Sequence, residues 1–370
     1  MQRLQLHRHL RQQQFHKQLC HKQLCHKQLG HKQLGQKECG AVLIITLWTI
    51  TLLTILVTVL AGQNRLSARV AQFHQEDLGN WANELAALNQ AEMEIMLDVM
   101  DPPVLSIDEQ LKNPVNPRYR NYRGAELQLA WPQADDIVVR IQDHAGKINL
   151  TEISRPRLRA MLEYKLGEDV DTDQLDELMS AWADWLDLNA QPSPTGAESE
   201  YYGEQELPYE ARNGRMETVE EILEIRGFGA IFADVELDAA FTLYGDSDLV
   251  NLNLATVEAM RLLPGLDEEL IDTIVAWRED HEFLGNGDVA QLVPAERMAE
   301  LRPWLNSRRV TNHYSIMAYQ RQTPDNEPTT AYAEIVEINS FADRPRVLKI
   351  NPYQTIPVTK IVINAEELAQ

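Results

Sequence analysis

The sequence predicts an α+β fold, in which one long N-terminal helix packs on an antiparallel sheet and a large all-α domain is inserted between the strands. Three observations support this fold class. Apolar residues at helical spacing continue without a proline from Ala41 to Met100. Strand-like runs of residues lie both before and after residues 151–302. The pattern of residues 151–302 themselves is helical, and a long helix is the simplest cover for the apolar faces of the strands.

The first part of the predicted helix is apolar enough to cross a membrane. Residues 41–61 contain no charged side chain, and as a helix they would span roughly 31 Å, against about 30 Å for a bilayer core. Two simpler interpretations remain open. The segment could be an uncleaved anchor, or a signal peptide cut after Ala61, where Val59-Leu60-Ala61 resembles a weak signal-peptidase site.

Charge divides the chain at this segment. Residues 1–40 contain eight Lys and Arg and one acid, Glu38, whereas the remainder carries a net charge of −29. A basic flank favours retention in the cytoplasm and export of the acidic part. All three cysteines, Cys20, Cys25 and Cys39, lie in the basic flank, so the exported part has no disulfide. The five-residue repeat from His16 to Gly40 is low-complexity sequence, to which we assign no function.

Local signals place the expected elements after the helix. The sequence "DPPV" at residues 101–104 ends the helix, and strands are expected at residues 125–131 and 136–143. A turn at "DHAG" then precedes "KINL" at residues 147–150. Further strands are expected at residues 313–321, 331–339, 345–353 and 360–368. The two groups of strands together supply the predicted sheet.

The helical segment contains a weak internal repeat of helix-hairpin-helix or SAM-like type. Each half opens with an apolar step and an Asn cap, at "INLTEI" and "VNLNLAT". In the second half, two helices joined by the hairpin "LPGLDEE" are indicated by apolar residues at helical spacing, namely Val257, Met260, Leu263, Leu266, Leu270, Ile274 and Trp277.

Such hairpins often bind DNA, so a membrane-anchored DNA receptor of competence type is the alternative function. DNA-binding hairpins hold a phosphate on backbone N–H groups of a Gly-apolar-Gly turn, with basic residues nearby. Here Gly265 is followed by Asp267, Glu268 and Glu269, and the exported part is strongly acidic. The sequence therefore predicts that the hairpin is packing scaffold and that the protein binds no nucleic acid.

One acidic loop is a candidate calcium site. The sequence "DWLDLNAQPSPTGAESEYY" gathers five oxygen-bearing side chains around a Pro/Gly/Ser loop: Asp184, Asp187, Asn189, Glu198 and Glu200. Hard oxygen ligands on a flexible loop suit Ca²⁺, and a solvated acidic loop is the alternative interpretation. The acids of "EDVDTD" fit better as a helix cap and first turn. Four histidines lie outside the leader, none beside a nucleophile motif, so no enzymatic activity is predicted.

Taken together, these features resemble the type II secretion minor pseudopilin K family, also called general secretion pathway protein K. The resemblance covers residues 37 to about 320 and rests on the order of "CGAVLIITLW", "GKINL", "WADWLD", "GAESEYY", "PYEARNG", "VEEILEIRG" and "VNLNLAT" followed by "LLPGL". The long HKQL leader departs from the family. The resemblance implies a cleaved leader (1–40), a transmembrane segment (41–61), a pilin-like domain (62–150 and 303–370) and an inserted helical domain (151–302).

The resemblance also implies processing, a cofactor and partners. A prepilin peptidase would cut between Gly40 and Ala41 and leave Ala41 as an N-methylated terminus, and a residue without a side chain suits a protease cleft. Calcium would bind in the helical domain, through the matching "D-W-x-D" and "G-A-E" residues. The protein would be a single-pass bacterial inner-membrane protein, with its N-terminus cytoplasmic and its C-terminal domain periplasmic. It would cap the tip of the pseudopilus and promote export of folded proteins, with I-type and J-type minor pseudopilins as partners.

One position distinguishes this chain from ordinary pilin-like subunits. Those carry a glutamate five residues into the mature chain, where this chain has Ile45. A subunit without that carboxylate cannot pair with the amino terminus of a neighbour inside an apolar filament core, so an interior position would be penalised. The alternative interpretation is that Ile45 merely keeps the membrane segment apolar.

Overall fold

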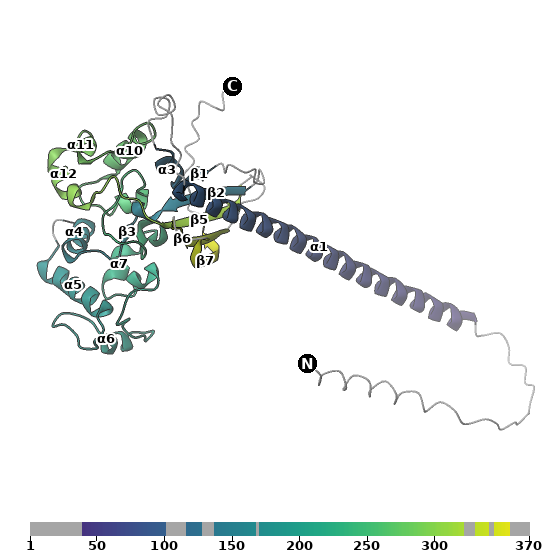
Figure 1. The fold of residues 1–370 in the computed structure, drawn as a ribbon. Coiled ribbons are helices and arrows are strands. Elements are labelled where there is room, and N and C mark those ends of the chain that lie inside the picture. The colour runs from purple at the N-terminus through teal and green to yellow at the C-terminus, as the bar shows by residue number, and fades with distance from the viewer. Residues whose placement is uncertain are drawn as a thin grey trace, which may run out of the picture. The chain divides into compact units, whose positions relative to one another are not determined.

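The computed structural model describes residues 39–100, 116–127, 137–167, 170–321, 330–339 and 344–355; of residues 39–41, 76–77 and 355 it describes the backbone alone. The chain forms two compact units, residues 1–72 and 73–370. Helix α1 (Cys39–Met100) supplies the described part of the first unit and continues into the second (Figure 1). It confirms the predicted helix and ends at Met100, directly before Asp101-Pro102-Pro103.

The second unit contains a five-stranded antiparallel sheet of order β1-β2-β5-β6-β7. Its strands are β1 (Arg123–Leu127), β2 (Ile137–Asp143), β5 (His313–Gln320), β6 (Thr330–Glu337) and β7 (Arg346–Thr355). A short helix, α3 (Pro117–Asn121), precedes β1 and starts with Asn116, whose side chain accepts the Arg118 N–H. The strands predicted at residues 136–143, 313–321, 331–339 and 345–353 are confirmed. Residues 128–131 and 360–368 lie outside the described residues.

The core of this part lies between α1 and one face of the sheet. Ala87, Leu88, Ala91 and Ile95 of α1 are buried in one cluster with alternate residues of the strands, which are Ile137, Val139, Ile141, Tyr314, Ile316, Ala318 and Val336. Residues three and four positions apart on α1 therefore pack against residues two positions apart on the strands. This packing confirms the predicted contact of a long helix with an antiparallel sheet.

Most of the helices lie between β2 and β5 in the sequence, and Figure 1 shows them gathered at one side of the sheet. In chain order the elements are η1 (His144–Gly146), β3 (Ile148–Asn149), α4 (Arg155–Leu166), α5 (Thr172–Leu186), α6 (Ser199–Gly203), η2 (Val219–Leu223), α7 (Phe228–Phe232), α8 (Leu237–Ala240), β4 (Phe241–Thr242), α9 (Val257–Met260), α10 (Glu268–Trp277), α11 (Asn286–Val289), α12 (Ala295–Leu301) and η3 (Arg302–Trp304). Strands β3 and β4 pair in parallel.

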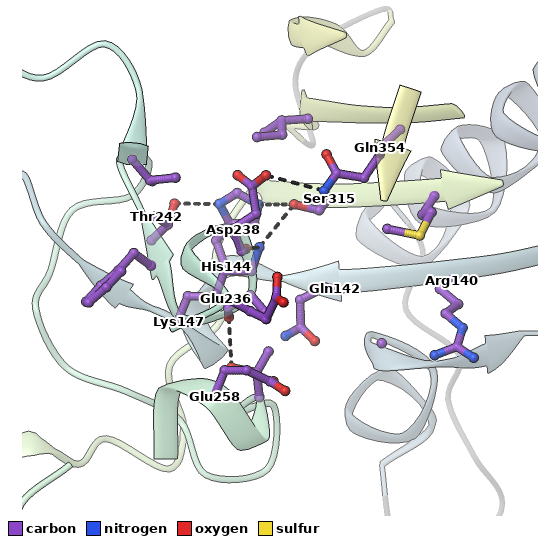
Figure 2. Close-up of a pocket in the computed structure, with 18 of the residues that line it drawn as sticks. Arg140, Gln142, His144, Lys147, Glu236, Asp238, Thr242, Glu258, Ser315 and Gln354 are labelled. Atoms are coloured by element: carbon purple, nitrogen blue, oxygen red, sulfur yellow. Dashed lines mark hydrogen bonds between the residues drawn. The ribbon is translucent and has the colours of Figure 1, made fainter. Parts of the chain in front are cut away.

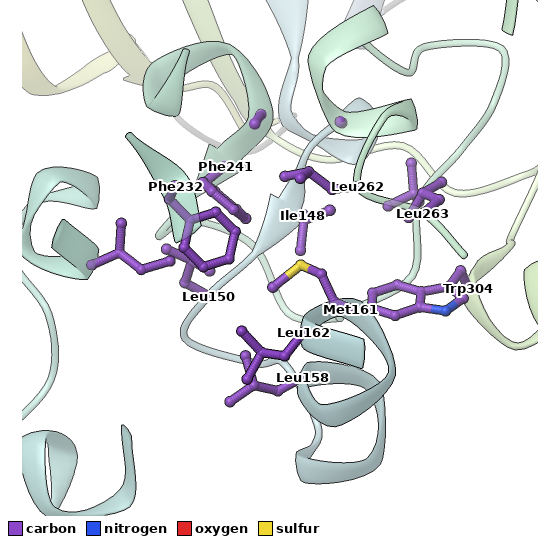
Figure 3. Packing of buried hydrophobic residues seen from close by; sticks show 14 of the residues in the cluster. Ile148, Leu150, Leu158, Met161, Leu162, Phe232, Phe241, Leu262, Leu263 and Trp304 are labelled. Atoms are coloured by element: carbon purple, nitrogen blue, oxygen red, sulfur yellow. The ribbon is translucent and has the colours of Figure 1, made fainter. Parts of the chain in front are cut away.

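These helices surround an apolar core of their own. Met161 and Leu162 of α4 meet Ile148 of β3 at its centre, with Phe232 and Trp304 on either side (Figure 3). The two Asn residues predicted as caps make the same local contact. Asn149 Oδ1 accepts the Thr151 N–H at 3.0 Å, and Asn251 Oδ1 accepts the Asn253 N–H at 3.0 Å.

The predicted hairpin differs from the structure in the length of its first helix. Helix α9 ends at Met260, so Leu263 lies in the turn and not in a helix, because a residue before proline disfavours helical dihedrals. Gly265 has a φ of +89°, and a Cβ there would lie 2.4 Å from the Arg297 carbonyl oxygen. This turn therefore requires glycine for packing against α12.

Candidate functional site: membrane segment, acidic loop and domain junction

The first part of α1 has the surface of a membrane-spanning helix. It is the one helix in the described part of the chain that is long and apolar enough to cross a membrane. Its threonines bond to the preceding turn of the helix, and Thr54 and Thr58 donate to the carbonyls of Ile50 and Thr54, each at 2.7 Å. The hydroxyl groups therefore leave no unsatisfied donor in an apolar environment, as expected from the sequence.

The predicted processing and assembly residues lie at the start of α1. Gly40 and Ala41 follow Cys39, the first residue of the helix, and only their backbone is described. Ile45 is 61% exposed, and its neighbours along the helix are also exposed apolar residues. The described part of the first unit therefore has no carboxylate near this position.

The acidic loop begins at a buried carboxylate. Asp184, near the end of α5, is fully buried and accepts hydrogen bonds from Ser193 N at 3.0 Å and Ser193 Oγ at 2.6 Å. Gly196 packs directly on this carboxylate, since a Cβ there would lie 1.8 Å from Asp184 Oδ2. The loop is thus folded back onto Asp184, which explains the glycine of "GAE".

A second buried carboxylate lies near the first. Glu198 is 3% exposed, and its Oε1 has no hydrogen-bond partner. Burial raises the pKa of Glu198, and the charges of Asp184 and Asp187 raise it further. With its amide nitrogen turned toward them, Asn213 donates to the Asn189 carbonyl oxygen at 3.0 Å and to Glu198 Oε2 at 3.3 Å. These oxygens therefore gather around one buried acid with unused acceptor capacity.

The remaining candidate ligands either accept hydrogen bonds from the loop backbone or are exposed to solvent. Asp187 Oδ1 accepts the Asn189 N–H at 2.9 Å, and Asn189 Oδ1 accepts the Gln191 N–H at 2.8 Å. Glu200, on α6, is exposed. Of the five predicted ligands, Asp184 and Asp187 lie near enough to Glu198 for their charges to raise its pKa, and Asn213 links Glu198 to the Asn189 carbonyl oxygen. Within the described ranges, no three His, Cys, Asp or Glu side chains form a group that could hold a metal ion.

The acids of the hairpin have structural partners. Asp267 caps α10 by accepting the Leu270 N–H at 3.0 Å and forms an ion pair with Arg297. Glu268 pairs with Arg261 at 2.8 Å. The carboxylates thus occupy the helix N-terminus where a phosphate would have to bind.

Two polar clusters at the junction of the sheet and the helices were not recognised from the sequence. In the first, the fully buried Asp143 accepts hydrogen bonds from Ala145 N at 2.8 Å and from Thr311. In the second, the ring nitrogens of His144 contact Thr242 Oγ1 at 2.7 Å and Ser315 Oγ at 2.8 Å (Figure 2). The only sequence signal was the turn "DHAG", which places both residues next to each other.

Burial determines the charge of the second cluster. Desolvation lowers the pKa of His144 well below its usual value, and the adjoining Lys147 lowers it further, so the imidazole is neutral at pH 7. Lys147 Nζ donates to the Asp238 carbonyl oxygen at 2.7 Å and to Ser315 Oγ at 3.3 Å (Figure 2). Burial also lowers the pKa of Lys147, to about 8.

Comparisons with known proteins find similarity in the helical part. Residues 146–234 match the family model described as type II secretion system (T2SS), protein K. A curated relative, type II secretion system protein K of Pectobacterium carotovorum subsp. carotovorum, is 30% identical over 96 residues, which are 26% of this chain. That match spans 29% of the relative's length.

A solved structure is also matched. It is a chain of the GspK-GspI-GspJ complex from the type 2 secretion system of enterotoxigenic Escherichia coli, with 14% identity and a TM-score of 0.49. The similarity covers 78% of this chain and 99% of that one. Residues 146–234 are therefore similar to the family of type II secretion system protein K, and the match covers about a quarter of this chain and less than a third of the curated relative.

Proposed function

We propose that this chain is a minor pseudopilin that caps the tip of a type II secretion pseudopilus and helps to initiate its assembly. It would thereby promote the export of folded proteins across the outer membrane. I-type and J-type minor pseudopilins would be its partners and would pack against α1. The match of residues 146–234 to the protein K family model supports the secretion role, and the helical insertion between β2 and β5 is the observation that carries the tip position.

The insertion favours a tip position because of its bulk. A compact domain of roughly 150 residues has a radius of gyration of about 15 Å. On a tightly packed shaft, such a domain would collide with the neighbouring subunits, whereas the end of a filament has room for it.

The position of Ile45 supports the same assignment. The side chain is apolar and exposed on α1, and it offers no acceptor to a neighbour's charged amino terminus. An unpaired ammonium in an apolar filament core is costly, so a subunit with Ile45 is disfavoured where another amine must be paired. The first subunit of a filament has no neighbour ahead of it and avoids this cost.

The processing and membrane assignments are part of the same proposal. A prepilin peptidase would cut between Gly40 and Ala41, the new terminus would be methylated, and α1 would remain in the inner membrane with residues 62–370 in the periplasm. The apolar, exposed surface of residues 42–60 supports a single membrane span.

Calcium binding is proposed for the acidic loop. Asp184, Asp187 and Glu198 supply hard oxygen ligands, and the unpartnered Oε1 of buried Glu198 fits a cation site. Burial and, to a smaller extent, the charges of Asp184 and Asp187 raise the pKa of Glu198, and a bound cation would offset both effects and hold the loop against α5. Glu200 is exposed and would contribute least.

The tip position is tested by site-specific cross-linking in assembled pseudopili. All native cysteines lie in residues 1–40, so the mature chain proposed here would contain only the cysteine introduced for the experiment. We expect one copy per filament, cross-linked to I-type and J-type subunits. Ile45→Glu should not become a repeated shaft subunit, because the helical insertion still prevents stacking, and Ile44→Glu is the matched control. Repeated copies along the shaft would refute the tip assignment.

A further inference from the structure

A cavity of 790 Å³ lies between the sheet and the helical part. Its wall on the sheet side comes from β2, β5, β6 and β7, and the opposite wall comes from η2, α8, β4, α9 and α10. Ser315, Ile316 and Met317 of β5 all line the cavity. Ile316 also belongs to the core cluster with α1, so the alternate residues Ser315 and Met317 lie on the sheet face away from α1. Figure 2 shows Lys147, His144 and Ser315 together at this cavity.

Two buried cations line this cavity. Lys147 and Arg278 are each 6% exposed. Arg278 Nη1 donates to the carbonyl oxygens of Leu252 and Ala255 at 3.0 Å and 2.6 Å, and its Nε has no partner. Lys147 donates to a carbonyl and a hydroxyl, as described above. Among the residues that the structure describes, neither cation has a carboxylate partner, so both retain capacity for an anion.

The charges of Asp238 and Glu258 in the lining raise the pKa of Lys147, but the ion pairs that these two carboxylates form are with other cations. Asp238 pairs with Lys349 at 3.8 Å, and Glu258 lies 4.0 Å from Arg261. Glu334 is on the α1 side of β6, because its register partner Ile316 packs against α1. The remaining acids of the lining are exposed, and these are Glu217, Glu236 and Asp272. The cavity is therefore cationic where it is buried and acidic where it is exposed.

We propose that this cavity binds the C-terminal end of a peptide, with the terminal carboxylate at Lys147. A carboxylate supplies the negative counter-charge that the buried Lys147 ammonium lacks. Charge-assisted hydrogen bonds are about twice as strong as neutral ones. The volume is far larger than a small inorganic anion needs. Phe241, Leu243 and Met317 provide apolar wall for the preceding side chains. The exposed acids of the lining favour a peptide with a basic residue several positions before its end.

The test uses the full-length protein in detergent and two peptides that differ in one group. The probe is a fluorescein-labelled octapeptide with a lysine near its start, two apolar residues at its end and a free carboxylate. The matched peptide ends in a carboxamide. By fluorescence anisotropy, we expect the amide to bind about tenfold more weakly, because it carries no negative charge to form an ion pair with Lys147.

Two variants separate the role of Lys147 from a general effect of charge. In Lys147→Met, the affinity for the acid peptide should fall to that for the amide, whose binding should be unchanged. Lys165→Met removes an amine that pairs with Asp234 outside the cavity and should leave the tenfold preference intact. No measurable binding of the acid peptide, equal binding of the two peptides, or an undiminished preference in Lys147→Met would each overturn the proposal.

A measurement on the unmodified protein keeps the proposal testable if Lys147→Met does not fold. Because its pKa is lowered, Lys147 has a larger unprotonated fraction at pH 8 than a surface lysine and can be reductively methylated. Mass spectrometry of digests should show that the acid peptide slows methylation of Lys147 and leaves Lys165 unaffected, while the amide protects neither. Equal protection of Lys147 by both peptides, or by neither, would contradict the proposal.

Discussion

The carboxylate of Asp143 accepts a 2.7 Å hydrogen bond from the hydroxyl of Thr311, 168 positions further along the chain. Asp143 ends β2 and Thr311 lies just before β5, so the bond joins the two points at which the helical part leaves and re-enters the sheet. The same carboxylate accepts the Thr311 N–H at 3.1 Å and contacts Arg118 Nη2 at 3.4 Å. Asp143 therefore links the end of β2, the segment just before β5 and the segment before β1.

Removing this carboxylate should destabilise the second unit. Asp143→Ala leaves the Thr311 and Ala145 N–H groups without an acceptor and removes the ion pair of Arg118 with Asp143, which we expect to cost about 2 to 4 kcal/mol. Urea unfolding followed by tyrosine and tryptophan fluorescence measures this loss. Asp246→Ala removes an exposed partner of Arg309 and should change the free energy of unfolding by less than about 0.5 kcal/mol. Equal effects of the two changes would contradict this role for Asp143.

Processing should depend on the glycine before the apolar segment. In Gly40→Leu, a branched side chain would replace the hydrogen at the proposed cleavage position, so the unprocessed form should accumulate in cells with an active prepilin peptidase. N-terminal sequencing of the membrane-extracted protein should give Ala41 for the unmodified chain. Gly62→Leu is the control and should mature normally. Normal maturation of Gly40→Leu would refute the cleavage site.

Calcium should stabilise the helical part through the acidic loop. An ion that binds only the folded state adds stability by mass action, about 1.4 kcal/mol at tenfold excess over the dissociation constant. We therefore expect millimolar Ca²⁺ to raise the Tm of a chelator-treated sample. Replacing both Asp187 and Glu198 by their amides should abolish this rise, whereas Glu200→Gln, at an exposed position, should retain it. If calcium left the Tm of the unmodified protein unchanged, the calcium site would be refuted and the alternative interpretation, a solvated acidic loop, would stand.

Glu334 should make stability fall as pH rises from about 4.5 to about 7. It is 7% exposed with an unpartnered Oε1, and burial together with Glu92 raises its pKa from 4.5 to about 7. The folded state therefore binds this proton more tightly than the unfolded state, and its stabilising effect is lost between pH 4.5 and 7. Glu334→Gln should be more stable than the unmodified chain at pH 8, by about 1 to 2 kcal/mol after allowance for solvent screening.

A second carboxyl on the same strand should behave in the opposite way. The pKa of Glu337 is lowered by a hydrogen bond from Asn339 and by the charges of His313 and Arg346. Its contribution is present above pH 4.5 and lost in acid, so Glu337→Gln should be no more stable than the unmodified chain at pH 8. Denaturant unfolding of both variants and of the unmodified chain at pH 5 and pH 8 measures how the free energy of unfolding of each changes with pH. A Glu334→Gln variant with the pH dependence of the unmodified chain would contradict the assignment.

Elements with a strong local pattern were predictable. The helix to Met100 and the strands β2, β5, β6 and β7 follow from spacings of three to four and of two along the chain, because burial of one face requires such periods. The first helix of the hairpin was predicted too long, since its apolar spacing continues into a turn that Pro264 and Gly265 form. The acidic loop was recognised as a group of oxygen ligands, but which of them are buried was not.

The sequence by itself determined the class of each segment: an apolar helix after a basic leader, an alternating sheet, an inserted helical part and a loop rich in carboxylates. These properties depend on neighbouring residues and are therefore visible in a short window. Tertiary structure alone decided that Asp143 meets Thr311, that Glu198 is buried near the charge of Asp184, and that Lys147 and Arg278 line one cavity. Their distances and pKa shifts arise from burial by segments far apart in the chain, and no local period encodes such burial.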